Sequence, residues 1–235
     1  MKERGIIFNA EMVRAILDGR KTQTRRIMKP QPTPCDYIDW RGKARGGHVW
    51  PSNIFRTMLH VEGELQNGDG GWKGLVGDAC PFGDVGDRLW VRETWQGPLV
   101  DYENANKLYK DPEPFQTTKN CVYKADGGTH PEYFDADDNL RYGWKSSAQM
   151  PRWASRILLE ITGVRVERLW DISQADAIAE GAPPSHPSID AVSREYGFPD
   201  FPRSWFGQTW WHIYGNENWQ ANPWVWVIEF KQIQG

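Results

Sequence analysis

The stretch GRKTQTRR, residues 19–26, decides how the first part of the chain folds. Before it, residues 5–8 are typical of a short strand, and Asn9 is suited to cap a helix whose apolar residues follow at helical spacing. Gly19 ends that helix. Residues 21–27 then alternate in the manner of a strand. Lys21 and Thr24 therefore stand at a helix-to-strand junction, where a cleft can be lined.

Four further elements follow along the chain. Residues 88–95 predict a strand, and residues 157–169 form a second β-type run. Ser173, with Asp176 three residues later, predicts a capped short helix that ends at Gly181. Residues 204–214 predict an amphipathic helix, and residues 223–230 predict a closing strand. This pattern places Glu180 on the last turn of the short helix.

The sequence between these elements is rich in turn formers. The 235 residues include 23 Gly and 16 Pro, and residues 30–82 and 96–147 show no sustained hydrophobic period. We interpret both stretches as insertions of loops and short strands. No linker separates two domains, so the sequence predicts a single domain over residues 1–235, mainly β with some α (α+β).

Composition narrows the class of partner. A net charge of −3 argues against non-specific coating of duplex nucleic acid, because that affinity comes from neutralising many phosphates. The 14 Trp residues indicate a large aromatic core, from which a few rings could serve as platforms for a nucleobase.

Cofactors and membranes have no support in the sequence. The three Cys and five His residues lack the spacing of a metal site, so we expect no metal and reduced thiols. Motifs for a phosphate-binding loop, a dinucleotide or a serine hydrolase are missing, and we expect no cofactor. The first residues are charged and no apolar run is long enough to span a bilayer, which predicts a cytoplasmic protein that does not enter membranes.

Several segments share a resemblance to one family. GRKTQTRR after a short helix resembles the opening of ASCH-domain proteins of the PUA-like superfamily, where a Gly-x-Lys-Thr-x-Thr-x-Arg pattern leads into a β-barrel. Residues 86–91, 169–181 and 226–230 resemble later elements of that family in the same order. The NPWVW ending, residues 222–226, resembles the larger ASCH proteins of phages and prophages. The resemblance implies a PUA-like β-barrel with short flanking helices.

The resemblance also implies a set of catalytic residues. Small bacterial N4-acetylcytidine amidohydrolases share the barrel and use a Lys, a Thr and a Glu, which match Lys21, Thr24 and Glu180 here. Amide hydrolysis needs a nucleophile, a base and a group that protonates the leaving amine. A Thr hydroxyl is a poor nucleophile, so Lys21 must be partly neutral, which burial or positive neighbours such as Arg25 would favour. In the alternative interpretation, all three residues are structural.

Further residues are candidates for ligand binding. Arg20 and Arg26 flank the proposed site and could hold a phosphate, while Glu93 is an alternative acid that Arg92 could pair with. The segment MPRWASR, residues 150–156, combines aromatic and basic side chains suited to stacking a base and gripping phosphate, although ordinary packing would also explain it. The predicted ligand-binding residues are therefore Arg20, Arg26, Glu93, Arg152, Trp153 and Arg156.

Three functions remain open at this point. The first is a protein that binds a modified nucleoside or nucleobase and hydrolyses an N-acyl amide such as that of N4-acetylcytidine. The second is a non-catalytic module that binds RNA or single-stranded nucleic acid in the same cleft. The third is a phage protein-interaction module whose two insertions contact a partner.

Overall fold

The computed structural model describes residues 1–34, 38, 40–44, 48–49, 79–135, 137 and 139–233. Its strands are β1 (Glu3–Ile7), β2 (Gln23–Ile27), β3 (Thr33–Pro34), β4 (His48–Val49), β5 (Arg88–Arg92), β6 (Trp95–Gln96), β7 (Val122–Tyr123), β8 (Glu132–Phe134), β9 (Leu140–Tyr142), β10 (Leu158–Arg168) and β11 (Trp224–Ile233). Its α-helices are α1 (Ala10–Leu17), α3 (Tyr102–Lys110), α4 (Gln174–Ala179), α5 (Pro187–Glu195), α6 (Phe201–Tyr214) and α7 (Asn216–Gln220). None of these helices is both long enough and apolar enough to cross a membrane.

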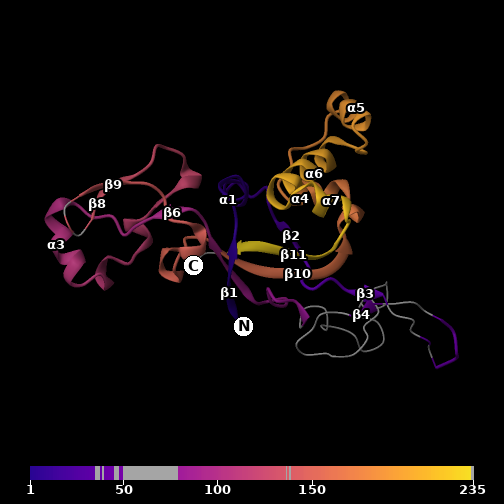
Figure 1. The fold of residues 1–235 in the computed structure, drawn as a ribbon, viewed down its shortest axis with the longest axis horizontal. Helices are drawn as coiled ribbons and strands as arrows, with labels where there is room; N and C mark the ends of the chain where they lie inside the picture. The colour runs from indigo at the N-terminus through magenta and orange to yellow at the C-terminus, as the bar shows by residue number, and fades with distance from the viewer. Residues whose placement is uncertain are drawn as a thin grey trace. The chain divides into compact units, whose positions relative to one another are not determined.

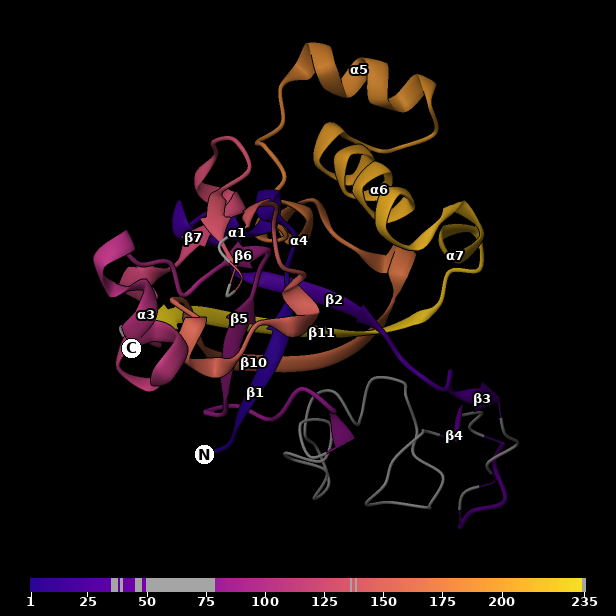
Figure 2. The ribbon, with the colours of Figure 1, turned by 60° about the vertical axis from the view of Figure 1, so that its left-hand side comes forward.

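Five strands form the main sheet, in the order β1-β5-β10-β11-β2 (Figures 1 and 2). Strands β1 and β5 are parallel, with Ile6 opposite Val91, and β11 and β2 are antiparallel, with Ile228 opposite Thr24. The outer strands of this order are β1 and β2, and within the described residues no pairing joins them. The fold is therefore mixed α and β, and the closed barrel that we expected is not confirmed.

The chain divides into two compact units, each assembled from segments far apart in sequence. The first contains Met1–Lys2, Gly19–Asp87 and Glu160–Lys231, and the second contains Glu3–Asp18, Arg88–Leu159 and Gln232–Gly235. Each unit has its own apolar cluster. Leu169, Phe206 and Val227 belong to that of the first unit, and Trp95 and Tyr123 to that of the second.

Several predicted helix ends are confirmed. Asn9 caps α1 by accepting a hydrogen bond from the Met12 N–H at 2.8 Å. Ser173 and Asp176 form the reciprocal capping box at the start of α4, which satisfies two backbone donors of the helix start. Gly181, at φ 106°, follows the end of α4 in a backbone conformation that favours glycine. Glu180 is the C-cap residue of α4, as the sequence predicts.

Other elements differ from the prediction. The strand expected over residues 88–95 is divided, because β5 ends at Arg92 and β6 begins at Trp95, so Glu93 lies between them. The predicted insertion 96–147 contains helix α3 and the hairpin β8–β9, and α5 is a helix that the sequence reading did not predict. The predicted insertion 30–82 lies mostly outside the described residues.

Candidate functional site

Lys21 is held between helix α4 and strand β11. The neighbouring Thr22 donates its N–H to the Ala179 carbonyl at 2.8 Å and accepts from the Phe230 N–H at 2.9 Å. These two hydrogen bonds fix the start of β2 against the end of α4 and against the closing strand. As a result, the Lys21 side chain enters the protein beside the C-cap of α4. The whole residue, backbone included, is 2 % exposed.

Lys21 and Glu180 form a buried ion pair. The ammonium Nζ lies 2.6 Å from Glu180 Oε2 and also donates to the Glu180 carbonyl at 2.9 Å. The two side chains are 0 % and 4 % exposed. Residues separated by 159 positions are therefore joined by charge-assisted hydrogen bonds in the interior of the first unit.

Burial lowers the pKa of the Lys21 ammonium. Desolvation is the largest cause, because it penalises the charged form, and Glu180 opposes it through its charge and its hydrogen bond. The positive charges of Arg26 and Arg25 lower this pKa further. Arg25 and Arg26 therefore favour the neutral form of Lys21, as we expected of positively charged neighbours.

Arg25 extends the ion pair into a network. Its guanidinium lies 2.8 Å from Glu167, 3.5 Å from Asp176 and 3.5 Å from Glu180, and its side chain is 0 % exposed. Packing adds to this, since the guanidinium carbon lies 5.9 Å from the centre of the Phe206 ring of α6. Arg25 is the residue through which β2 contacts both β10 and α4.

Arg165 of β10 is the third cation of this network and shares the carboxylates Glu167 and Asp176 with Arg25. It pairs with Asp176 at 2.7 Å and also with Glu167 and Glu229. Burial opposes ionisation of Asp176, but the Ser173 hydroxyl and the two arginines outweigh it and lower the pKa of this carboxyl. Three cations and four carboxylates therefore share one region of the first unit, and burial lowers the pKa of one of these cations, the Lys21 ammonium.

The Thr24 side chain points to the face of β2 opposite the one that contacts the charged network. Arg25 contacts the carboxylates of α4 and β10, and Gln23 accepts a hydrogen bond from Arg165 at 3.3 Å, which places residues 23 and 25 on the face that carries the network. Because side chains alternate along a strand, Thr24 points to the other face. The structure brings Lys21 and Glu180 together. The nucleophilic role of Thr24 stays a prediction, and the alternation of side chains along β2 does not favour it.

The two predicted ligand-binding arginines near Lys21 have different surroundings. Arg20 donates to the Gly181 carbonyl at 3.2 Å and so ties the start of β2 to the turn after α4. Arg26 is half-buried on the same face of β2 as Thr24. It acts on Lys21 through its charge.

The second unit contains a separate ion pair between the buried Glu93 and the half-buried Arg156. The Arg156 guanidinium donates to both Glu93 oxygens, at 2.9 and 3.1 Å, and to Asp126 at 2.8 Å. It lies 4.0 Å from the centre of the Tyr123 ring. Burial raises the pKa of Glu93, and Arg156 opposes that rise. The prediction that Arg92 pairs with Glu93 is wrong, because Arg92 donates to the Ala148 carbonyl and lies over the Trp90 ring.

Arg152 and Trp153 have partners elsewhere in the second unit. Arg152 pairs with Glu3 at 3.0 Å. Trp153 packs edge to face on Trp95, with ring centres 5.5 Å apart. Of the four ligand-binding residues predicted in this unit, the structure therefore joins only Glu93 and Arg156 to each other.

Some site residues were missed by sequence reasoning. Asp126 and Tyr123 complete the surroundings of Arg156, and Glu167 and Arg165 complete those of Arg25. The alternation of charged residues along β10 is the one signal in the sequence that could have indicated a polar face there. Within the described part of the chain, no group of three or more His, Cys, Asp or Glu residues is arranged to hold a metal ion.

Comparisons of the chain with protein-family models, with curated proteins and with solved structures find no match. The function of the protein is therefore inferred from its sequence and from the geometry of its residues.

Proposed function

We propose that this protein binds a modified nucleoside or nucleobase and hydrolyses an N-acyl amide on it, such as that of N4-acetylcytidine. The observation that carries the proposal is the buried Lys21–Glu180 pair, in which desolvation lowers the pKa of the ammonium. A lower pKa increases the fraction of neutral amine, which is the form of lysine that can act as a base. The two residues are also those that the resemblance to ASCH amidohydrolases implies, on a barrel scaffold that stays part of the proposal.

The pair can supply the proton transfers of amide hydrolysis. Neutral Lys21 takes a proton from the attacking water as the oxygen adds to the acyl carbon, and Glu180 is placed to receive that proton from Lys21. When the C–N bond breaks, the proton passes to the leaving nitrogen, so that one water and one N-acyl base give one carboxylic acid and one amine. We assign the attack to water because Thr24 points to the other face of β2.

The test is to incubate the protein with N4-acetylcytidine and to follow cytidine by chromatography. We expect release of cytidine by the wild type and none by Lys21→Ala. Lys29→Ala is the matched control, because Lys29 is an exposed lysine in the same segment. Absence of turnover by the wild type, or unchanged turnover by Lys21→Ala, would reject the proposal.

Folding must be checked separately, because loss of one member of a buried pair is destabilising. Circular dichroism and a urea transition would show whether Lys21→Ala is folded at the assay temperature. Glu180→Gln offers a second variant that keeps the size and hydrogen-bonding capacity of the side chain while removing its charge. We expect it to be folded and to lose activity.

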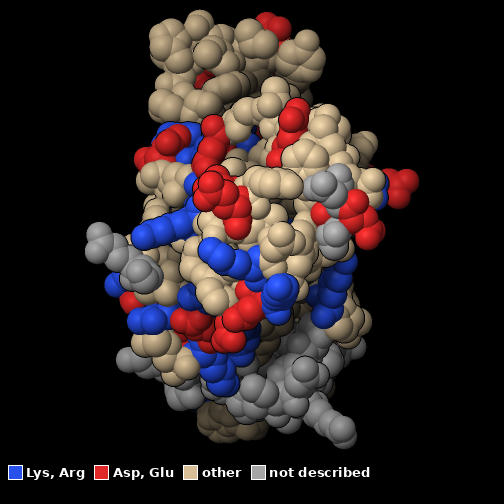
Figure 3. All heavy atoms as spheres, turned by 90° about the vertical axis from the view of Figure 1, so that its left-hand side faces the viewer, with Lys and Arg blue, Asp and Glu red and all other residues tan. Residues whose placement is uncertain are grey.

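Binding without catalysis is the second candidate, and the position of Thr24 favours it. Lys21 and Glu180 lie on the side of β2 that carries Gln23 and Arg25, whereas the Thr24 hydroxyl that the resemblance pairs with them points to the other side. On the face drawn in Figure 3, Lys and Arg side chains are interspersed with Asp and Glu, so this face has no broad basic surface of the kind that binds a long duplex. Saturable binding of N4-acetylcytidine with no cytidine released would support this function over hydrolysis.

A further inference from the structure

A pocket in the second unit lies outside everything described so far. Its volume is about 470 Å³, which is in the range of sites for small organic ligands. Its walls come from the residues before α3, from α3 itself and from the hairpin β8–β9. Its lining includes the apolar and aromatic residues Leu99, Ala105, Tyr109 and Tyr133 and the carboxylates Glu132 and Asp135.

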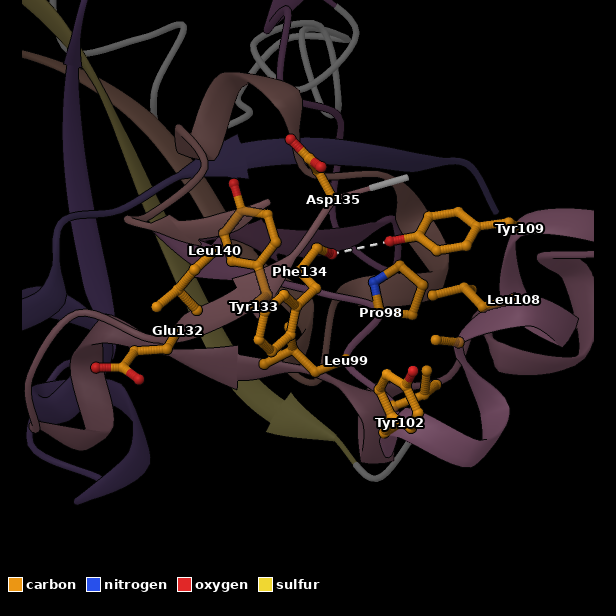
Figure 4. A pocket seen from close by; sticks show the side chains of 12 residues that line it. Pro98, Leu99, Tyr102, Leu108, Tyr109, Glu132, Tyr133, Phe134, Asp135 and Leu140 are labelled. Carbon is orange, nitrogen blue, oxygen red and sulfur yellow. Dashed lines mark hydrogen bonds between the residues drawn. The ribbon is translucent and has the colours of Figure 1, made fainter. Parts of the chain in front are cut away.

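The walls of this pocket are held in place by one hydrogen bond across it. The Tyr109 hydroxyl of α3 donates to the Phe134 carbonyl of β8 at 2.8 Å, as the dashed line in Figure 4 shows. The pocket is therefore bounded by two elements that are fixed to each other, with Pro98 and Leu99 between them (Figure 4).

The lining is aromatic and apolar, and much of it is open to solvent. Tyr102 is 79 % exposed, Phe134 is 53 % exposed and Tyr109 is 47 % exposed. Single exposed aromatic residues are common, but a group of them around a cavity marks a binding surface. Aromatic rings offer flat faces and bury a large area for little loss of side-chain entropy when a ring stacks on them.

Charge selects among aromatic ligands. Among the described residues that line the pocket, the charged ones are Glu132 and Asp135, and none is Lys, Arg or His. Asp135 is balanced by Arg141 at 2.7 Å, and Glu132 is exposed at the other end of the pocket (Figure 4). A phosphate or carboxylate on the ligand would meet carboxylates without a basic partner in the lining.

We propose that this pocket binds one planar aromatic molecule that carries no negative charge. Its size accommodates a ring system of one or two fused rings, and its lining offers ring faces rather than charge partners. The site belongs to the second unit, whereas Lys21 and Glu180 belong to the first, so this proposal does not depend on hydrolysis.

The test uses three probes with the same ring and different charge: indole, tryptamine and indole-3-acetate. Binding is measured by calorimetry and by saturation-transfer NMR on the full chain. We expect indole and tryptamine to bind, and indole-3-acetate to bind at least about threefold more weakly than tryptamine, as for a partly exposed charge. Equal or tighter binding of indole-3-acetate, or no binding of indole, would overturn the proposal.

Two variants locate the binding. Ala105→Trp fills the pocket from α3 and should abolish binding of indole, whereas Asn106→Trp adds the same side chain at the next, exposed position and should leave it unchanged. Tyr133→Leu keeps an apolar wall without the ring and should weaken indole binding about tenfold. Unchanged binding in both Ala105→Trp and Tyr133→Leu would place the ligand elsewhere and reject the pocket.

Discussion

The Lys21–Glu180 pair and the Glu93–Arg156 pair both contain a buried glutamate, but Lys21 is fully buried whereas the Arg156 side chain is 22 % exposed, and the two pairs are suited to different tasks. Glu180 and Glu93 are similar carboxylates, 5 % and 1 % exposed. The cations differ, because a lysine can give up its proton when it is desolvated and an arginine cannot. The Arg156 fork therefore holds Glu93, Asp126 and the Tyr123 ring in a fixed geometry, whereas Lys21 is placed where a proton can move.

The largest expected effect comes from exchanging the cations. Lys21→Arg keeps the positive charge but replaces the amine with a guanidinium, which does not act as a base in proteins. We therefore expect release of cytidine from N4-acetylcytidine to fall by at least about a hundredfold. Arg156→Lys should change the same rate by less than about threefold. Comparable losses in both variants would show that the two pairs do not differ in the way described here. The rates should be measured at equal folded fraction.

Stability should separate the two pairs next. Lys21→Met leaves Glu180 with a buried charge, and we expect a loss of about 3–5 kcal/mol in the free energy of unfolding. Glu93→Gln should cost less, about 2 kcal/mol, because Arg156 keeps Asp126 and Tyr123 as partners. Urea titrations give both values.

The double variant Lys21→Met/Glu180→Leu is the control for this comparison. It removes both buried charges and should recover most of the stability lost in Lys21→Met. If the double variant is as unstable as the single one, the loss comes from packing and not from the Glu180 carboxylate, which in Lys21→Met keeps only the 3.5 Å contact with Arg25 among the ion pairs of the described residues.

The pH dependence of stability should have opposite signs at the two pairs. Burial raises the pKa of Glu93 above the usual 4.5, so its contribution to stability is present below that value and is lost as pH rises through the raised pKa. Burial lowers the pKa of Lys21 below the usual 10.5, so the unfolded chain binds this proton more tightly, and the contribution of Lys21 grows as pH rises from the lowered pKa toward 10.5.

Urea unfolding as a function of pH measures these slopes against matched variants. The stability of the wild type relative to Glu93→Gln should fall as pH rises from 4.5. Relative to Lys21→Met, the stability of the wild type should increase as pH rises from the lowered pKa of Lys21 toward 10.5. Parallel curves in either comparison would contradict the stated direction for that residue.

The smallest expected effect is at Thr24. Thr24→Val keeps the shape of the side chain and removes the hydroxyl, and we expect the rate of hydrolysis to change by less than about threefold, because the hydroxyl points away from Lys21 and Glu180. A loss as large as that of Lys21→Ala would identify Thr24 as the nucleophile. The assignment of the attack to water would then be wrong.

Local signals in the sequence predicted the elements that position the first site. Asn9, Gly19 and the Ser173–Asp176 capping box mark the ends of α1 and the start of α4, because caps depend on residues within one or two turns. These signals are sufficient to place Lys21 before β2 and Glu180 at the end of α4.

Long-range pairing could not be predicted in the same way. Arg92 precedes Glu93 in the sequence, but its guanidinium donates to the Ala148 carbonyl, and the partner of Glu93 is Arg156, 63 positions away. Arg25 reaches Glu167 across 142 positions. Such pairs depend on the strand order of the sheet, which no pattern within one segment specifies.

The most direct test of the central claim is to titrate the Lys21 amine itself. Lysine labelled with ¹³C at Cε, with the signal assigned by its loss in Lys21→Met, reports the pKa of this group by NMR. We predict a pKa below 10.5 in the wild type, and a still lower value in Glu180→Gln, because Glu180 favours the charged form. A Lys21 pKa at or above 10.5 in the wild type would contradict the account.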